Sequence, residues 1–241
     1  MNSTDSLTTG EAVRRAPSLS FADLPGLMSL QTGDEKHGPA ATSTLDVLWV
    51  LYDEILAVSP AALDDPGRDR FYLSKGHGPM AYYAVLAAKG FIPVDWLSGF
   101  GGARSRLGHH PDRRLVPGVE ISSGSLGHGF PLAVGTALGL RAQGIDSRVV
   151  CLVGDAELDE GSNAEAMTIA GSLGLSNLTV VVVDNRSSSH GWRHGVGSHF
   201  EVDGWRVRCV DGRDHRELAA ALRRTPATVP NVVVAEVEDQ S

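Results

Sequence analysis

The chain has 241 residues, of which 42% are hydrophobic, and this is enough to bury a sizeable core in one or two domains. Its formal net charge of −8 argues against a nucleic-acid-binding surface, which needs a basic face. No apolar stretch approaches the ~18 residues of a membrane-spanning helix, and the N-terminal segment lacks the apolar centre of a secretory signal. We therefore expect a cytoplasmic protein that binds neither nucleic acid nor membrane.

The first half of the chain favours helices. Residues 1–20 are polar, and we expect them to be disordered ahead of a single folded domain that spans residues 21–241. Apolar periodicity and turn residues then predict a short helix over 21–30, a helix over 42–58, a short strand over 71–73 and a helix over 80–88. The glycine-rich stretch from Gly99 to Gly118 has little periodicity and is interpreted as an ordered loop.

The second half alternates strands and helices. Residues 126–141 predict a helix that is apolar nearly all round and rich in small residues, which favours close packing against other helices. After the central unit described next, the pattern predicts a polar loop over 186–199, a strand over 206–210, a helix over 214–224 and a strand over 231–237. Cys151 and Cys209 both fall inside predicted strands, so we expect two buried, reduced thiols.

The rest of the chain is organised around the segment from Arg148 to Asn185. An apolar run over 149–153 ends in Gly154-Asp155, and a second apolar run over 179–183 ends in Asp184-Asn185. Between them, Ser162-Asn163-Ala164-Glu165 fits a capping box and predicts a helix that begins at Ser162. This is the strand–helix–strand pattern of a right-handed parallel crossover.

Both strands of this crossover deliver a polar residue to the same edge of one sheet. Asp155 follows the first strand and Asn185 the second, and ligands bind at the carboxyl edge of open α/β sheets. A carboxylate and an amide beside a glycine suit Mg²⁺ and a diphosphate. We predict one doubly wound α/β domain, with a largely parallel sheet and helices on both faces.

Short sequence motifs in and around this unit resemble those of transketolase. Gly154-Asp155 with Asn185 thirty residues further on looks like the thiamine-diphosphate motif. Three more segments match the family in order, and they are residues 69–77 (DRFYLSKGH), 108–111 (GHHP) and 117–127 (PGVEISSGSLG). The resemblance covers residues 37–236, and it is to the N-terminal, diphosphate-binding (PP-type) part of transketolase alone.

The resemblance implies residue roles. It implies thiamine diphosphate as cofactor with Mg²⁺, or another divalent cation such as Ca²⁺ or Mn²⁺, held by Asp155, Asn185 and the main-chain carbonyl of Ser187. The other implied cofactor contacts are His77, Gly124, Ser125, Leu126, Gly154, Ala156 and Glu157. The residues implied to act in catalysis are His37, His77, His110 and Glu160, the last through an acidic network between paired active sites.

One position departs from the family within this motif. The third residue of the family's Gly-Asp-Gly is Ala156 here, and a glycine at that point suggests a positive φ or a close backbone approach. We therefore expect Ala156→Gly to tighten cofactor binding or to leave it unchanged.

The resemblance also implies a partner. The chain lacks the family's pyrimidine-binding domain, which carries the glutamate that activates the cofactor. We expect the diphosphate-binding subunit of a split transketolase-like enzyme, which transfers a two-carbon ketol unit from a ketose donor to an aldehyde. It would act only with a separate C-terminal subunit, in an α₂β₂ heterotetramer with a small-molecule substrate. The alternatives are a subunit of an acyloin-forming thiamine enzyme that uses a 2-oxo acid, and a non-catalytic cofactor-binding scaffold for a partner.

Overall fold

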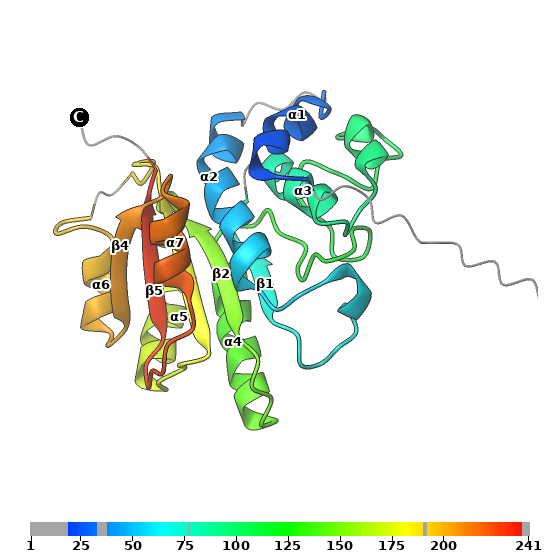
Figure 1. Cartoon of the computed structure of the whole chain (residues 1–241). Helices are drawn as coiled ribbons and strands as arrows, with labels where there is room; N and C mark the ends of the chain where they lie inside the picture. Colours follow the sequence, from blue (N-terminus) through cyan, green and yellow to red (C-terminus); the bar gives the residue numbers. More distant parts are fainter. Residues whose placement is uncertain (1–18, 33–37, 77, 190–191, 238–241) are drawn as a thin grey trace, which may run out of the picture.

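The computed structural model describes residues 19–32, 38–76, 78–189 and 192–237. A single sheet of parallel strands forms its centre (Figure 1). The strands are β1 (Arg70–Leu73), β2 (Val149–Gly154), β3 (Leu178–Asp184), β4 (Arg206–Asp211) and β5 (Asn231–Glu236). Their order across the sheet is β1-β2-β3-β5-β4, so the last strand lies between β3 and β4.

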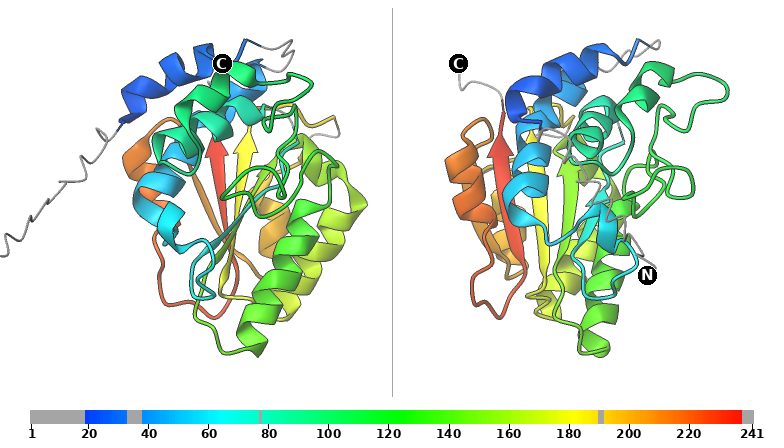
Figure 2. Two further views of the ribbon diagram at one scale, coloured as in Figure 1. Left: turned by 90° about the vertical axis from the view of Figure 1, so that its right-hand side faces the viewer. Right: turned by 45° about the vertical axis from the view of Figure 1, so that its right-hand side comes forward.

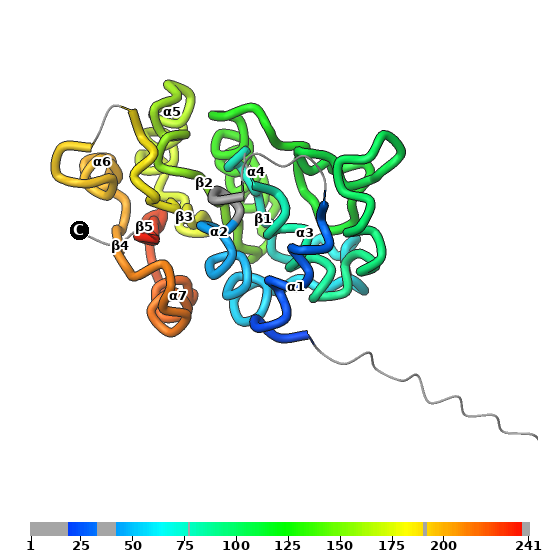
Figure 3. The backbone as a smooth tube through the Cα atoms, turned by 90° about the horizontal axis from the view of Figure 1, so that it is seen from above, coloured from blue at the N-terminus to red at the C-terminus, as the bar shows by residue number. Residues whose placement is uncertain are grey.

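Helices cover both faces of this sheet, as the view from above shows (Figure 3). One face carries α2 (Gly38–Val50) and α7 (His215–Leu222), with α3 (Pro79–Ala88) packed against α2 and α1 (Leu24–Ser29) packed against α3. The other face carries α4 (Gly129–Ala142), α5 (Gly161–Ser172) and α6 (Gly197–Val202). Val150 and Leu152 join the first core, whereas Cys151 and Val153 join the second. The predicted doubly wound fold is confirmed.

Short helical turns connect these elements. They are η1 (Phe21–Asp23), the π-helical turn η2 (Leu51–Ile55), η3 (Pro60–Ala62), η4 (Val94–Gly99) and η5 (Ala156–Asp159). The helix predicted over 42–58 begins earlier, at Gly38, and changes to the wider π-helical turn after Val50 before the chain becomes extended at Leu56. The prediction of disorder for residues 1–20 falls, except for 19 and 20, outside the described residues.

The predicted helix start at Ser162 is wrong. Helix α5 begins at Gly161 with Glu160 as its N-cap residue, and the Ser162 hydroxyl donates a hydrogen bond to the carbonyl of Gly127 at 2.7 Å. The Asn163 side chain donates to the carbonyl of Glu157 at 2.6 Å. The serine and asparagine of the supposed capping box therefore bind neighbouring loops.

Two further expectations need correction. Helix α4 begins at Gly129, three residues after the predicted start, and α6 occupies part of the stretch predicted to be a polar loop. Cys151 is buried in β2 as expected, but Cys209 is exposed because β4 is an edge strand; both thiols are free. None of the helices in the described part of the chain is long and apolar enough to cross a membrane.

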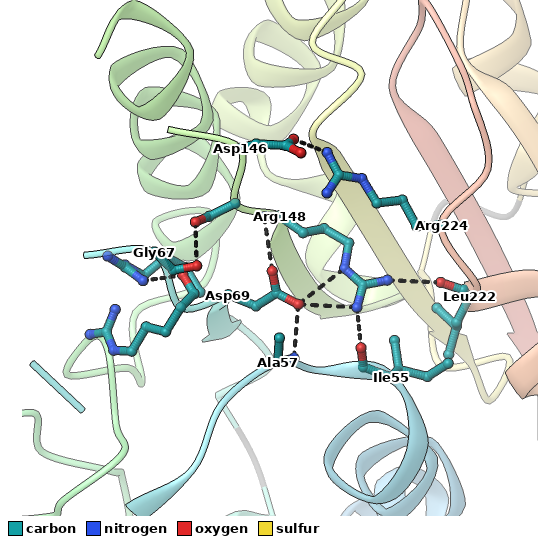
Figure 4. Close-up of polar contacts among 11 residues, drawn as sticks. Ile55, Ala57, Gly67, Asp69, Asp146, Arg148, Leu222 and Arg224 are labelled. Atoms are coloured by element: carbon teal, nitrogen blue, oxygen red, sulfur yellow. Dashed lines mark hydrogen bonds and ion pairs between the residues drawn. The ribbon is translucent and has the colours of Figure 1, made fainter. Parts of the chain in front are cut away.

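The amino ends of β1 and β2 are held together by a buried ion pair (Figure 4). Asp69 and Arg148 are 7% and 9% exposed, and the Asp69 carboxylate accepts hydrogen bonds from Arg148 Nη2 at 3.1 Å and from its backbone N–H at 3.0 Å. The same guanidinium donates to the carbonyls of Ile55 and Leu222, at the ends of η2 and α7. One arginine thus joins two strands and two helical elements at the edge of the sheet opposite the carboxyl ends.

Candidate functional site

The carboxyl ends of the strands point to one end of the molecule (Figure 2). Asp155 directly follows β2, and its backbone N–H donates to the carbonyl of Val183 in the neighbouring β3 at 3.2 Å. Asn185 directly follows β3. The structure therefore brings Asp155 and Asn185 to one edge on adjacent parallel strands, as their spacing predicted.

Asp155 is enclosed by the loop that follows β3. Its side chain is 1% exposed, and it accepts hydrogen bonds from the Ser187 hydroxyl at 2.7 Å and from the Ser188 backbone N–H at 2.9 Å. Asp159, in η5, accepts from the Ser188 hydroxyl at 3.1 Å and from the Ser189 N–H at 3.2 Å. Two carboxylates therefore fix the serine loop over the end of β2.

Asn185 presents an oxygen atom to this edge. Its side-chain Oδ1 is buried and has no hydrogen-bond partner among the described residues. The next residue, Arg186, has a left-handed backbone with φ of 56°, and its N–H donates to Asp184 Oδ1 at 3.0 Å. A non-glycine residue in this region costs about 1 kcal/mol. The turn after β3 is therefore held in a strained conformation beside a buried, unpaired amide oxygen.

These groups fit a magnesium ion. No cluster of three His, Cys, Asp or Glu side chains that could hold a metal occurs in the part of the chain described here, so a site of the zinc type is not formed by those residues. Mg²⁺ differs, because it is held by one or two carboxylates together with water and phosphate oxygens. The buried Asp155 carboxylate and the unpaired oxygen of Asn185 supply such a set. The main-chain carbonyl of Ser187 stays a predicted third ligand.

A second cluster lies on three other loops. His110 Nδ1 is 2.7 Å from the carbonyl oxygen of Gly76, so Nδ1 carries the proton and donates. Gly124 has φ of +123°, and a Cβ at that position would stand 2.8 Å from Cγ of His110. Only glycine fits between these loops. The structure therefore brings His110 and Gly124 together, while His37 and His77 lie outside the described residues.

Glu157 ties this second cluster to the first. It is 2% exposed, and its Oε1 accepts hydrogen bonds from the Ser74 hydroxyl and from the Gly127 backbone N–H. Burial raises the pKa of Glu157, and the bonds from Ser74 and Gly127 oppose that rise. Its other oxygen, Oε2, is buried and has no partner among the described residues. In the structure, Glu157 joins the loop after β1 to the 124–127 loop. Its contact with the cofactor stays a prediction.

The remaining predicted residues, Ser125, Leu126 and Glu160, lie at or near the surface beside these loops. Ser125 is exposed and Leu126 half-buried, between the tight positions Gly124 and Gly127. Glu160 is exposed at the N-terminus of α5, and a Cβ at Gly127 would stand 2.8 Å from Cβ of Glu160. Glu160 therefore borders the 124–127 loop. Its catalytic role stays a prediction.

Ala156 shows no sign of the strain that its place in the motif suggested. It is the first residue of η5, and it is not among the described non-glycine residues with positive φ. Alanine adopts this conformation without cost, so the backbone gives no reason to expect that glycine would improve cofactor binding.

We expect Ala156→Gly to lower the free energy of unfolding by about 0.5 kcal/mol without tightening cofactor binding. Glycine enlarges the conformational freedom of the unfolded chain, and the folded loop gains nothing in return. Urea unfolding and calorimetric titration with cofactor and Mg²⁺ measure the two quantities. Tighter binding at unchanged stability would contradict this prediction.

Sequence reasoning missed residues that the structure places here. Lys75 is 9% exposed, and its ammonium group donates to the Ser43 hydroxyl at 2.8 Å. Burial lowers the pKa of Lys75 to about 8, against the opposing influence of Asp155 and Glu157. Asp159 was missed as well. Lys75 lies within the family-like segment 69–77, but the resemblance assigned it no role.

The chain is a doubly wound α/β protein with Asp155 and Asn185 at the carboxyl edge of its sheet, and comparison with known proteins gives the family. Residues 26–235 match the family described as transketolase, thiamine diphosphate binding domain. The chain belongs to this family.

Among curated proteins, the chain is 55% identical over 232 residues to a Rhodococcoides fascians protein named Ferredoxin fas2, a match that covers 95% of this chain and 76% of that protein. It is 36% identical over 206 residues to one subunit of the apulose-4-phosphate transketolase of Actinobacillus succinogenes, covering 83% and 75% of the two chains. The solved transketolase from Leishmania mexicana superposes with a TM-score of 0.73 at 27% identity. That match covers 90% of this chain and 36% of the Leishmania chain, so the chain spans about a third of the solved enzyme.

Proposed function

We propose that this chain is the diphosphate-binding subunit of a transketolase-like enzyme that depends on thiamine diphosphate and Mg²⁺. The reaction moves a two-carbon ketol unit from a ketose-type donor to an aldehyde acceptor. The observation that carries the proposal is the edge formed by β2 and β3, where the buried Asp155 carboxylate and the buried, unpaired amide oxygen of Asn185 follow the ends of two adjacent parallel strands. Membership in the transketolase family supports the choice of cofactor.

Each group of residues has a part in this mechanism. Bound thiamine diphosphate supplies an electron sink for breaking a carbon–carbon bond next to a carbonyl. Asp155, Asn185 and the carbonyl of Ser187 would hold the metal that the diphosphate needs. Gly124, Ser125 and Leu126 would offer backbone groups to the pyrimidine end of the cofactor, and Gly154 would allow its close approach.

His110 is suited to proton transfer in this site. Because Nδ1 donates to the carbonyl of Gly76, a neutral imidazole has its acceptor lone pair on Nε2. A substrate hydroxyl could be oriented, or give up its proton, at that atom. His37 and His77 are proposed for similar duties on the strength of the family resemblance alone.

We further propose that the enzyme needs a partner subunit with the pyrimidine-binding domain, in an α₂β₂ assembly. The chain spans about a third of the solved Leishmania enzyme, and the Actinobacillus relative is named as one subunit of a transketolase. Helices α4 and α5 also expose large apolar side chains on their outer faces, which a partner would cover. These are Leu132, Leu138, Ile169 and Leu173.

The test of this proposal is turnover with and without the partner. The purified chain, supplied with Mg²⁺, thiamine diphosphate and a ketose phosphate with an aldehyde acceptor, should show no sustained carbon–carbon bond formation. Addition of the partner subunit should restore turnover and should tighten cofactor binding by mass action. Steady-state assays on chain shown by mass spectrometry to be free of partner decide the question. Sustained turnover by the chain alone would refute the split-enzyme proposal.

The word ferredoxin in the name of the Rhodococcoides relative is not carried over to this chain. Iron–sulfur clusters are held by four cysteine thiolates, or by two cysteines and two histidines. This sequence has two cysteines, and they lie on β2 and β4, with β3 and β5 between these strands. The two free thiols do agree with a cytoplasmic location, which we propose for the enzyme.

A further inference from the structure

Lys75 is a buried charge to which the metal and cofactor contacts assign no role. It is the second residue after β1 ends, and it is 9% exposed. Its ammonium group donates to the hydroxyl of Ser43 in α2 at 2.8 Å, and Ser43 is itself 2% exposed. A lysine removed from water loses much of its hydration energy, so such residues are rare unless a negative group lies nearby.

The position of Lys75 points its charge to the candidate site. A Cβ added to Gly154 would stand 3.6 Å from Cγ, Cδ and Cε of Lys75, so the lysine stem lies across the last residue of β2. Asp155 and Glu157 are the acidic groups that act on its charge. Lys75 follows β1, and β1 pairs with β2, the strand that ends at Gly154.

We propose that Lys75, held in place by Ser43, supplies the positive charge that faces the cofactor's diphosphate. This inference rests on the proposed function. The edge already carries the carboxylates of Asp155 and Asp159, and a diphosphate adds further negative charge that one Mg²⁺ only partly balances. A lysine acts on phosphates as a point charge, which suits a flexible stem packed under the glycine that the diphosphate approaches.

The test compares the full-length wild-type chain with Lys75→Met, which keeps the length and apolar stem of the side chain and removes its charge. Three probes are titrated calorimetrically and by thermal shift in the presence of Mg²⁺, namely thiamine diphosphate, inorganic pyrophosphate and thiamine. We expect Lys75→Met to bind both diphosphates about 10- to 100-fold more weakly, the effect of losing a hydrogen bond to a charged group. Its weak affinity for thiamine should not change.

Three further variants make the result specific. Ser43→Ala leaves the charge and removes its anchor, so we expect a loss of a few fold for both diphosphates. Lys89→Met is the matched control, because Lys89 is a lysine that pairs with Asp53 and lies over the Trp49 ring, away from the strand ends. Its affinity for all three probes should equal that of the wild type. Lys75→Arg keeps the positive charge and should recover part of the lost diphosphate affinity. This variant provides the test if Lys75→Met folds poorly.

The outcomes separate this inference from the proposed function. If Lys75→Met melts at a lower temperature but binds pyrophosphate as the wild type does, Lys75 only supports the fold and the inference is wrong. If the wild type together with its partner subunit gains no stability from either diphosphate at millimolar concentration, the proposed function is wrong and this inference with it. Weaker binding confined to the two diphosphates would support both.

Discussion

Replacing Asp155 with alanine is expected to weaken Mg²⁺-dependent binding of thiamine diphosphate at least about 100-fold in the assembled enzyme. Loss of a group that only orients a metal ligand lowers affinity about 10- to 100-fold, and a charged ligand to the metal should cost more. Asp155 is the buried carboxylate that follows β2, on the strand adjacent to the one that Asn185 follows, and it is the carboxylate of the predicted metal-ligand set. Calorimetric titration at fixed Mg²⁺ measures the effect.

The matched control for this variant is Asp211→Ala. Asp211 also ends a strand at the carboxyl edge, but β4 is separated from β2 by two other strands. Cofactor affinity should be unchanged in that variant. Circular dichroism of the Asp155 variant without cofactor should show the wild-type fold, while its melting temperature should fall because the serine loop and the charge of Lys75 both lose a partner. Unchanged affinity in Asp155→Ala would mean that the metal is held elsewhere.

Replacing Arg148 with methionine is expected to lower the free energy of unfolding by about 3–5 kcal/mol. Methionine fills a similar volume but leaves the Asp69 carboxylate buried with no opposite charge, which is the costly way to break a buried ion pair. The carbonyls of Ile55 and Leu222 lose their donor at the same time. Urea unfolding followed by tryptophan fluorescence gives the change in free energy.

Arg224→Met is the matched control for Arg148→Met. Arg224 pairs with Asp146 at the same end of the molecule (Figure 4), but these two side chains are 54% and 83% exposed. Exposed pairs contribute about 0–1 kcal/mol, so this variant should change stability by no more than that. Equal effects of the two arginine variants would show that burial does not set the strength of the Asp69–Arg148 pair. If Arg148→Met does not fold at all, Arg148→Lys, which keeps the charge with fewer donors, should give an intermediate loss.

The sequence was sufficient to predict the sheet and one edge of it. Valine-rich runs of five residues that end in Gly154-Asp155 and in Asp184-Asn185 have few alternatives to buried parallel strands, so both strand ends were placed within a residue. Local signals at helix ends were less reliable. Ser162 fits a capping box, yet its hydroxyl donates to the carbonyl of Gly127. That carbonyl belongs to a loop 35 positions away in the sequence. Pattern within a segment carries no information about such a neighbour.

The site could be predicted only in part for the same reason. Asp155 and Asn185 were found because each lies at a strand end. The roles of Lys75 and Glu157 depend on which loops meet above the sheet, since the first is anchored on α2 and the second joins Ser74 to Gly127. The sequence also could not show that Ala156 has an ordinary backbone conformation. A family pattern gives the residue type at each position, but it does not give the dihedral angles of the loop in this chain.

The place of β5 in the sheet has a consequence for how the protein folds during synthesis. Strand β4 is joined to the sheet only through β5, although β5 follows it in the chain. Until residues 231–236 have left the ribosome, β3 therefore presents an unpaired edge of consecutive valines, the kind of edge that promotes aggregation. Stalling or truncation before Asn231 should then yield insoluble chains in which β4 has no neighbouring strand to pair with, even though Asp155 and Asn185 have both been made.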